Sequence, residues 1–136
     1  MSKSDCLFCR IVAQNQKFAP TLFGQLQQFC FGAKNATLKP KSAPAEVVYE
    51  DREVLAFKDI KPAAPIHLLI VPKKHIDSIK EVQVSETKLI GKLILVAQKI
   101  AAKQQLSGYK LIFNVGKDGG QVIFHLHLHL LGGFRP

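Results

Sequence analysis

Three histidines alternate with large apolar residues near the end of the chain. His125, His127 and His129 are separated by leucines, and Phe124 and Leu130 extend the alternation on either side. Because successive side chains of a β-strand point to opposite faces, this spacing places the imidazoles on one face and the apolar groups on the other. The pattern predicts a strand with one face on a core and the other face available for chemistry.

Imidazole suits chemistry near neutral pH because its ordinary pKa is about 6.5. There it can act as a nucleophile, an acid, a base or a metal ligand. The chain has five histidines in 136 residues, and three of them fall in this register. That clustering favours an active site over a partly exposed strand with incidental histidines.

The composition is that of a single domain, residues 1–136, with one core. Hydrophobic residues make up 47% of the chain, and no run approaches the ~20 apolar residues that span a bilayer. The N-terminus lacks the apolar stretch of a secretion signal, so we expect a cytoplasmic location, with the nucleus as a second compartment. The three cysteines, an odd number, argue against a secreted disulfide framework.

The chain is basic, with 19 Lys and Arg against 10 Asp and Glu and a formal net charge of +9. This balance suits an anionic partner such as a phosphate or a nucleotide. Segment 17–42 holds four lysines and no acidic residue, so the rest of the chain is only moderately basic. We therefore do not expect a nucleic-acid partner, and a basic nucleic-acid module is a third interpretation at most.

Hydrophobic periodicity predicts five strands and one main helix. The helix, residues 85–106, carries an apolar stripe at helical spacing, with Ser85 as its N-cap and Gly108 as its stop signal. The expected strands are residues 47–50, 54–58, 66–71, 109–115 and 122–131. Segment 17–42 has no period that we can assign, and we expect an irregular insertion there, whose composition also suits a retained intron.

Two short motifs add candidate chemistry. The turn from Asn114 to Gly120 is rich in glycine, which lets backbone N–H groups approach a phosphate, although Asp-Gly-Gly is also ordinary hairpin composition. Cys6 and Cys9 form a C-x-x-C pair, which is either half of a zinc site or two buried thiols that pack as small apolar groups. His75 follows two lysines and is expected on the surface.

Taken together, these motifs resemble the histidine triad (HIT) superfamily, and within it the branch of histidine triad nucleotide-binding (Hint) proteins. The matching segments are 6–12, 48–51, 55–60, 64–67, 71–76, 118–121 and 125–133. The resemblance implies an α+β, HIT-like fold with a five-stranded antiparallel sheet, one main helix and a short second helix. It also implies a homodimer.

The same resemblance implies a nucleotide-binding hydrolase that cleaves the P–N bond of purine nucleoside phosphoramidates, with adenosine 5'-monophosphate conjugates as the usual class. His127 would attack the α-phosphorus and carry a nucleotidyl intermediate. His125 and His67 would orient the site, and His129 would donate to a phosphate oxygen. Catalysis would require no cofactor.

The implied binding residues come from most of the domain. Asp59 would bind the ribose hydroxyls, and apolar side chains would hold the base. The other implied nucleotide contacts are Leu7, Phe8, Ile11, Phe57, Ile60, Leu69, Asn114, Gly120, Gln121 and Val122, beside His127 and His129. A structural zinc, which some relatives bind, would use Cys6, Cys9, His67 and His125.

The chain departs from the family pattern at three places. Segment 17–42 is additional, the sequence ends without a Trp-Pro-Pro-like tail, and Val122 stands where relatives often carry a hydroxyl or carboxylate that assists the leaving group. Loss of a proton donor can cost ~10² to 10⁴ in rate where general acid catalysis matters, so we expect slow turnover. Two alternatives stay open. One is a dinucleotide polyphosphate hydrolase or nucleotidyl transferase of another HIT branch, and the other is a catalytically weak nucleotide-binding scaffold or signalling protein.

Overall fold

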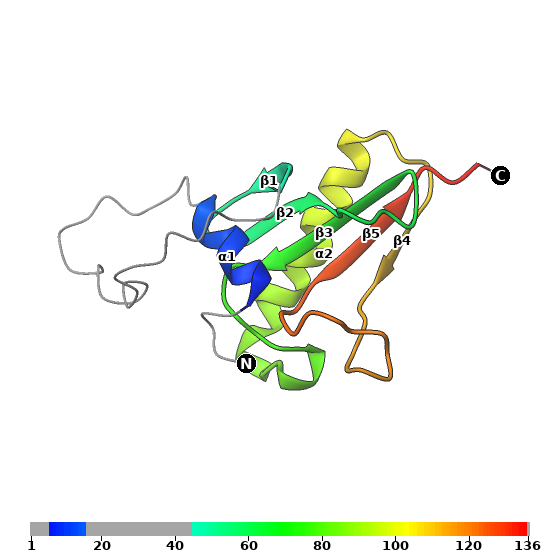
Figure 1. Ribbon diagram of the computed structural model, residues 1–136. Helices are drawn as coiled ribbons and strands as arrows, with labels where there is room; N and C mark the ends of the chain where they lie inside the picture. Colours follow the sequence, from blue (N-terminus) through cyan, green and yellow to red (C-terminus); the bar gives the residue numbers. More distant parts are fainter. Residues whose placement is uncertain (1–5, 16–44, 136) are drawn as a thin grey trace, which may run out of the picture.

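The computed structural model describes residues 6–15 and 45–135 (Figure 1). The insertion predicted at 17–42 lies outside the described residues. The helices are α1 (Leu7–Gln14) and α2 (Thr87–Lys103), and two 3-10 turns, η2 (Ile79–Glu81) and η3 (Val84–Glu86), precede α2. The strands are β1 (Val47–Glu50), β2 (Val54–Lys58), β3 (Ile66–Pro72), β4 (Tyr109–Ile112) and β5 (Leu128–Gly132).

The five strands form one antiparallel sheet in the order β1-β2-β3-β5-β4. The last strand therefore lies between β3 and β4, and His129 is opposite Leu69 on one side and Ile112 on the other. The predicted α+β fold, with its antiparallel sheet, main helix and short second helix, is confirmed. Among the described residues, no helix is long and apolar enough to cross a membrane.

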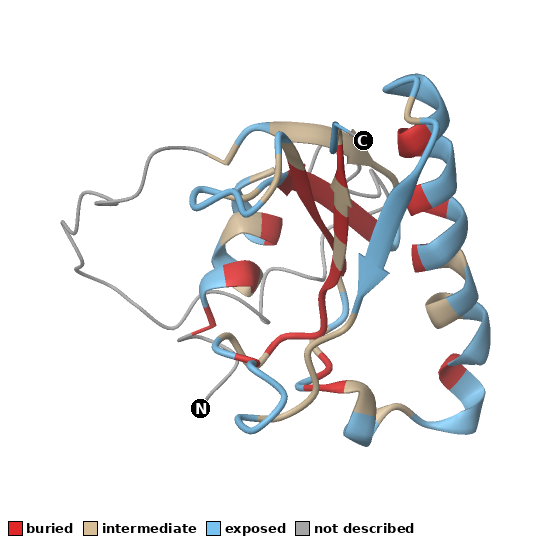
Figure 2. Cartoon of the chain, turned by 90° about the vertical axis from the view of Figure 1, so that its right-hand side faces the viewer, coloured by how far each residue is buried: buried red, intermediate tan, exposed pale blue. Residues whose placement is uncertain are grey.

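The two helices cover opposite faces of the sheet (Figure 2). Strand residues such as Val54, Ala56, Leu68 and Ile70 pack with the buried face of α2. The residues between them, among which are Leu55, Phe57, Leu69 and Val71, pack with Phe8 and Val12 of α1. Because side chains alternate along a strand, inner strands covered on both faces are apolar at nearly every position.

The strand predicted at 122–131 is wrong in its first half. β5 begins at Leu128, so His125 and His127 precede the strand and only His129 lies within it. The ladder to β3 ends at the Ile70 and Leu128 pair, because beyond it the His125 side chain, and not a backbone N–H, binds the Pro72 carbonyl. The alternation of side chains nevertheless continues before the strand, since Leu126 is buried in the core between α2 and the sheet.

Other boundaries also differ from the predicted ones. β4 ends at Ile112 and not at residue 115. Helix α2 begins at Thr87, because Gln83 and Glu86 form a capping box around the preceding 3-10 turn, so Ser85 is not the N-cap. The helix ends at Lys103, and Gln105, at φ 56°, turns the chain before Gly108 is reached.

Candidate active site and metal-binding site

A pocket of about 450 Å³ lies between α1, the middle of the sheet and the loop before β5. Its wall is apolar where α1 faces β2 and β3, and His127 and His129 lie on the same lining as Asp59. The lining contains every residue implied as a nucleotide contact except Gln121. The structure thus brings Leu7, Phe8, Ile11, Phe57, Asp59, Ile60, Leu69, Asn114, Gly120, Val122, His127 and His129 to one cavity.

Hydrogen bonds fix the proton positions on His67 and His129. The Ala63 N–H donates to His67 Nδ1 at 3.0 Å, so the single proton of that ring is on Nε2. His67 Nε2 lies 2.8 Å from His129 Nδ1 and donates to it. His129 must then carry its own proton on Nε2. Asn114 Nδ2 lies 3.3 Å from that atom, and because an amide nitrogen only donates, the two groups form a hydrogen bond when the Asn114 amide is turned to present its oxygen. His129 is therefore prepared to donate a hydrogen bond from Nε2.

A backbone carbonyl fixes the proton of His127. Its Nδ1 lies 2.7 Å from the His125 carbonyl oxygen, which can only accept, so Nδ1 carries the proton and Nε2 keeps a free lone pair. The Phe8 ring packs edge-on against His127, with centroids 5.2 Å apart. His127 is thus held in one tautomer and one orientation, and its unprotonated nitrogen is the type of atom that attacks phosphorus.

Burial keeps both pocket histidines neutral. It lowers the pKa of His127 below the ordinary value. For His129, burial is again the main cause, the neighbouring His127 and His67 add to it, and its pKa falls to about 4 despite the opposing effect of Asp59. Both rings are therefore uncharged at neutral pH, as a nucleophile and a neutral donor require.

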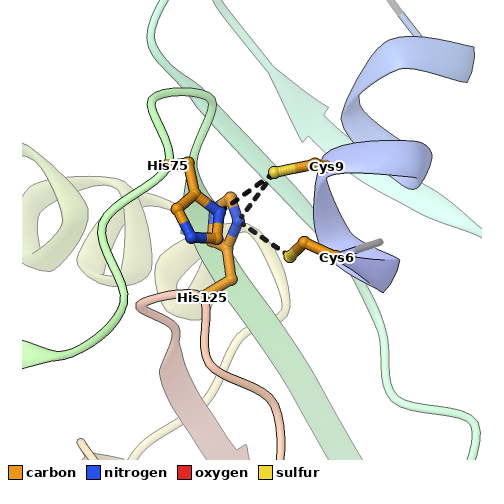
Figure 3. A group of neighbouring side chains, drawn as sticks. All are labelled: Cys6, Cys9, His75 and His125. Carbon is orange, nitrogen blue, oxygen red and sulfur yellow. Dashed lines mark hydrogen bonds between the residues drawn. The ribbon is translucent and has the colours of Figure 1, made fainter. Parts of the chain in front are cut away.

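Two cysteines and two histidines converge at the start of α1 (Figure 3). The donor atoms of Cys6, Cys9, His75 and His125 all lie within 4.8 Å of one another. His125 Nε2 donates to the Pro72 carbonyl at 2.8 Å, which leaves Nδ1 unprotonated and 3.5 and 3.4 Å from the two sulfur atoms. His75 Nε2 lies 2.6 Å from an Asp77 carboxylate oxygen, so its Nδ1 is likewise free and lies 3.1 Å from Cys9 Sγ.

These four side chains fit a tetrahedral zinc ion. Zinc at ~2.3 Å from sulfur and ~2.05 Å from nitrogen separates an S and an N ligand by about 3.6 Å. The tautomers set by Pro72 and Asp77 direct both imidazole lone pairs toward the thiols, and two thiols with two imidazoles are a donor set that zinc prefers. The group is already close to the required spacing.

The structure does not bring together the four zinc ligands predicted from the sequence. The two nitrogens of His67 are engaged by Ala63 and by the pocket residue His129, so His67 supports the pocket and does not face the cysteines. His75, which we expected on the surface, has a side chain only 11% exposed and takes its place. The Leu126 N–H donates to the Ile76 carbonyl and so holds the two histidine-bearing segments together. Sequence alone carried no signal of that backbone contact.

Asp59, His67 and His129 form a second group close enough to hold an ion. The hydrogen bond between the two rings already accounts for their approach. We therefore assign this group to the pocket and not to a metal.

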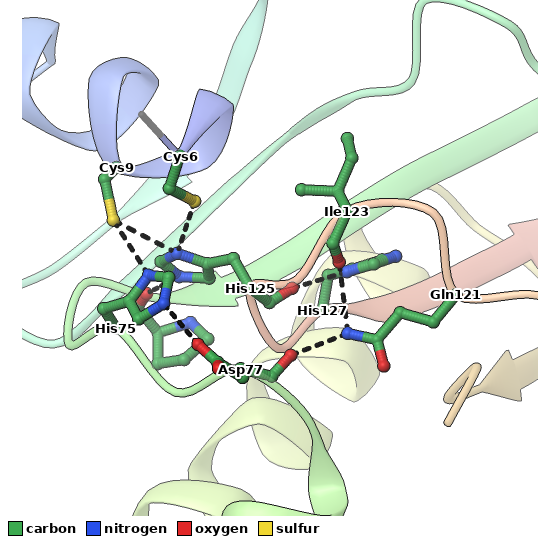
Figure 4. Close-up of polar contacts among 9 residues, drawn as sticks. Cys6, Cys9, His75, Asp77, Gln121, Ile123, His125 and His127 are labelled. Carbon is green, nitrogen blue, oxygen red and sulfur yellow. Dashed lines mark hydrogen bonds and ion pairs between the residues drawn. The ribbon is translucent and has the colours of Figure 1, made fainter. Parts of the chain in front are cut away.

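Gln121 has a different place from the one that the family resemblance implies, whereas Val122 lies at the pocket as implied. Gln121 is 3% exposed and does not line the pocket. Its side-chain oxygen accepts from the Gly116 N–H. Its side-chain nitrogen donates to the carbonyls of Asp77 and Ile123 (Figure 4). It shapes the loop from behind. Val122 is 85% exposed on the pocket rim and offers no side-chain proton.

Comparison with known proteins places this site in a family. The HIT domain family model matches residues 40–135, and the chain belongs to that family. Protein HitA of Neisseria gonorrhoeae is 48% identical over 93 residues, which are 68% of this chain and 87% of HitA.

Solved structures agree with this assignment. A HIT family hydrolase from Legionella pneumophila Philadelphia 1 has a TM-score of 0.74 and 40% identity, covering 96% of this chain and 95% of that one. A histidine triad protein from Clostridium difficile has a TM-score of 0.75 and 34% identity, covering 100% and 96%. The chain is thus similar to HIT family hydrolases over nearly its whole length.

Proposed function

We propose that the protein is a hydrolase that cleaves the P–N bond of purine nucleoside phosphoramidates, with adenosine 5'-monophosphate conjugates as the substrate class. One observation carries the proposal. The His127 Nδ1 bond to the His125 carbonyl leaves Nε2 unprotonated, on a residue that lines a pocket with apolar walls. Similarity to HIT family hydrolases supports the same reaction class.

In the first step, His127 Nε2 attacks the α-phosphorus, an Nε2–P bond forms and the P–N bond breaks. The ring becomes cationic, and the His125 carbonyl, already bonded to Nδ1–H, stabilises that charge. The His129 Nε2–H would donate to a phosphate oxygen, because His67 and Ala63 fix its tautomer. Val122 has no proton to give, so the departing amine takes its proton from water.

In the second step, water attacks the phosphorus of the nucleotidyl-His127 intermediate. A P–O bond forms, the Nε2–P bond breaks, and the water proton passes to solvent, which yields the nucleoside monophosphate and restores the neutral ring. Asp59, which lines the pocket, would accept hydrogen bonds from the ribose hydroxyls. The base would lie between α1 side chains such as Leu7 and Ile11 and the sheet residue Leu69.

Replacement of the nucleophile tests the reaction. We expect His127→Ala to abolish turnover of an adenosine phosphoramidate and to leave binding of adenosine monophosphate within a few-fold, since the pocket walls remain. Single-turnover assays with wild type should also trap a phosphorus-linked histidine at this position by mass spectrometry. Unchanged turnover in the purified variant would refute the assignment.

Exposed Val122 keeps a second candidate open, a catalytically weak nucleotide-binding scaffold. Nucleotide binding by wild type without any turnover would favour it. A dinucleotide polyphosphate hydrolase or nucleotidyl transferase of another HIT branch is distinguished by rates on a phosphoramidate and on a diadenosine polyphosphate, measured side by side.

We further propose that Cys6, Cys9, His75 and His125 hold one structural zinc ion, which would cross-link α1 to the loops beside the pocket. The reaction above needs no metal. Elemental analysis of protein purified without a histidine tag should give about one zinc per chain, and Cys9→Ser should lower that value and the melting temperature. A zinc content below a tenth of an equivalent in wild type would contradict the site.

A further inference from the structure

A chain of contacts leads from the metal-binding group to the glycine-rich loop of the pocket, and Asp77 stands at its centre (Figure 4). Asp77 uses two different atoms. Its carboxylate Oδ1 accepts from His75 Nε2 at 2.6 Å. Its backbone carbonyl accepts from Gln121 Nε2, also at 2.6 Å. One residue therefore contacts both a metal-site side chain and the glutamine that shapes the loop.

Gln121 carries this connection into the loop. Its Oε1 accepts from the Gly116 N–H at 3.0 Å, and its own backbone N–H donates to the Gly116 carbonyl at 3.0 Å. Residues 116 and 121 are thus clamped together twice, and Gly120 and Val122, which line the pocket, lie at this clamp. A shift of the Gln121 side chain would open one half of the clamp and loosen the pocket rim.

The carboxylate of Asp77 acts through His75. The His75 ring presents Nδ1 to Cys9 Sγ, so its proton must be on Nε2, and a carboxylate bonded to that N–H fixes both the tautomer and the ring orientation. The Asp77 side chain is 58% exposed, and an exposed ion pair contributes little to stability by itself. Its effect should therefore appear in metal affinity more than in folding.

We propose that Asp77 is a positioning residue that connects the metal site to the glycine-rich loop of the pocket. Its carboxylate orients His75, and its backbone carbonyl anchors Gln121. This inference rests on the proposed zinc site. When zinc fixes His75, it also fixes the Asp77 segment, and the loop from Gly116 to Val122 keeps its shape before a substrate arrives. Loss of zinc should loosen that loop while the sheet stays folded, because no strand pairing passes through these contacts.

The experiment uses three variants of the full chain. Asp77→Ala removes the carboxylate, and Asp77→Asn keeps an acceptor oxygen in the same place. Glu81→Ala is the matched control, because it removes a carboxylate from an exposed residue whose side chain makes no hydrogen bond or ion pair among the described residues. Zinc affinity is measured by competition with a chelator, and hydrogen exchange of the Gly116 amide reports the loop.

We expect Asp77→Ala to weaken zinc binding about 10- to 100-fold, the usual cost of removing a partner of a metal-bound histidine, and Asp77→Asn to weaken it less. Gly116 should exchange faster in wild type after zinc is removed, and in Asp77→Ala even with zinc bound. Glu81→Ala should match wild type in both measurements. If Asp77→Ala does not fold, two other variants test the inference. One is Asp77→Asn, and the other is Gln121→Glu, which should speed hydrogen exchange at Gly116 without changing zinc affinity.

Unchanged zinc affinity in the folded Asp77 variants would overturn the inference. So would a Gly116 hydrogen-exchange rate in wild type that is the same with and without zinc. Neither measurement requires turnover. A protein that shows the link but hydrolyses no phosphoramidate would refute the proposed reaction and leave the role of Asp77 intact. A wild type that binds no zinc would refute the metal site and this inference together.

Discussion

At the scale of single residues, backbone groups decide what each histidine can do, because a carbonyl can only accept a hydrogen bond and an N–H can only donate one. The Ala63 N–H and the carbonyls of Pro72 and His125 are groups of this kind. Each sets the tautomer of one ring, so chemically identical side chains suit the different roles that we propose: a donor at His129, through His67, a nucleophile at His127 and a metal ligand at His125. Their roles follow from backbone partners and not from the spacing of the histidines.

The depressed pKa of His129 predicts how stability depends on pH. Its pKa is about 4 in the folded protein and about 6.5 when unfolded, so between these values the unfolded state binds the extra proton. The contribution of a neutral His129 is therefore complete above pH 6.5 and is lost as the pH falls toward 4.

Thermal unfolding in the presence of a chelator measures this effect without the metal. The melting temperature of wild type should decline between pH 6.5 and 4, and the decline should be shallower in His129→Gln, which cannot take the proton. Parallel profiles for the two proteins would show that His129 does not titrate as its burial indicates.

At the scale of elements, the loop between β4 and β5 holds a glycine that has no room for a side chain. A Cβ on Gly119 would lie 2.3 Å from the Val115 carbonyl oxygen, a backbone atom that cannot move aside without reshaping the turn. Gly91, within α2, has no such neighbour within 4 Å. The two glycines therefore offer a matched pair, one required by a close approach and one that only weakens a helix.

We expect Gly119→Ala to lower the free energy of unfolding by about 1–3 kcal/mol, the usual cost of forcing an extra carbon into a packed site. It should also reduce kcat/KM, because Asn114 and Gly120 on either side line the pocket. Gly91→Ala should raise stability by roughly 0.5–1 kcal/mol through helix propensity. Urea unfolding and phosphoramidate turnover check both variants, and equal effects would contradict the distinction.

At the scale of the whole molecule, α2 and β4 present apolar groups that no described residue covers. Leu95 is 63% exposed and Ile94 43%, and β4 is an edge strand with Leu111 and Ile112 each 37% exposed. An open apolar edge strand tends to pair with another chain. The homodimer implied by the family resemblance stays a prediction, and this surface is where we propose it forms.

Sedimentation of wild type should give the mass of a dimer, and Leu95→Asp should give a monomer at micromolar concentration, because a charge would be buried unpaired at the interface. Val84→Asp is the control, since Val84 is equally apolar and 92% exposed but lies outside α2 and β4. A dimeric Leu95→Asp variant would place the interface elsewhere.

The fold was predictable from local pattern, and most of the pocket was predictable from the resemblance to a family. Period-2 and helical spacing identified the sheet and α2, and the motif resemblance named twelve residues that the fold brings to one cavity. The predicted start of the last strand was wrong because the His125 side chain, and not a backbone N–H, binds the Pro72 carbonyl. The spacing of apolar residues does not indicate which group a backbone carbonyl will bind.

The sequence by itself determined that His127 and His129 share a face and that Cys6 and Cys9 form a C-x-x-C pair, because alternation and spacing are local properties. Only the tertiary structure decided which histidine completes the cysteine group. His67 lies within β3 and His75 follows the end of that strand, and contacts from α1 and from Leu126 direct His75 to the cysteines. Those contacts join residues far apart in the chain, and their geometry exists only once the sheet has formed.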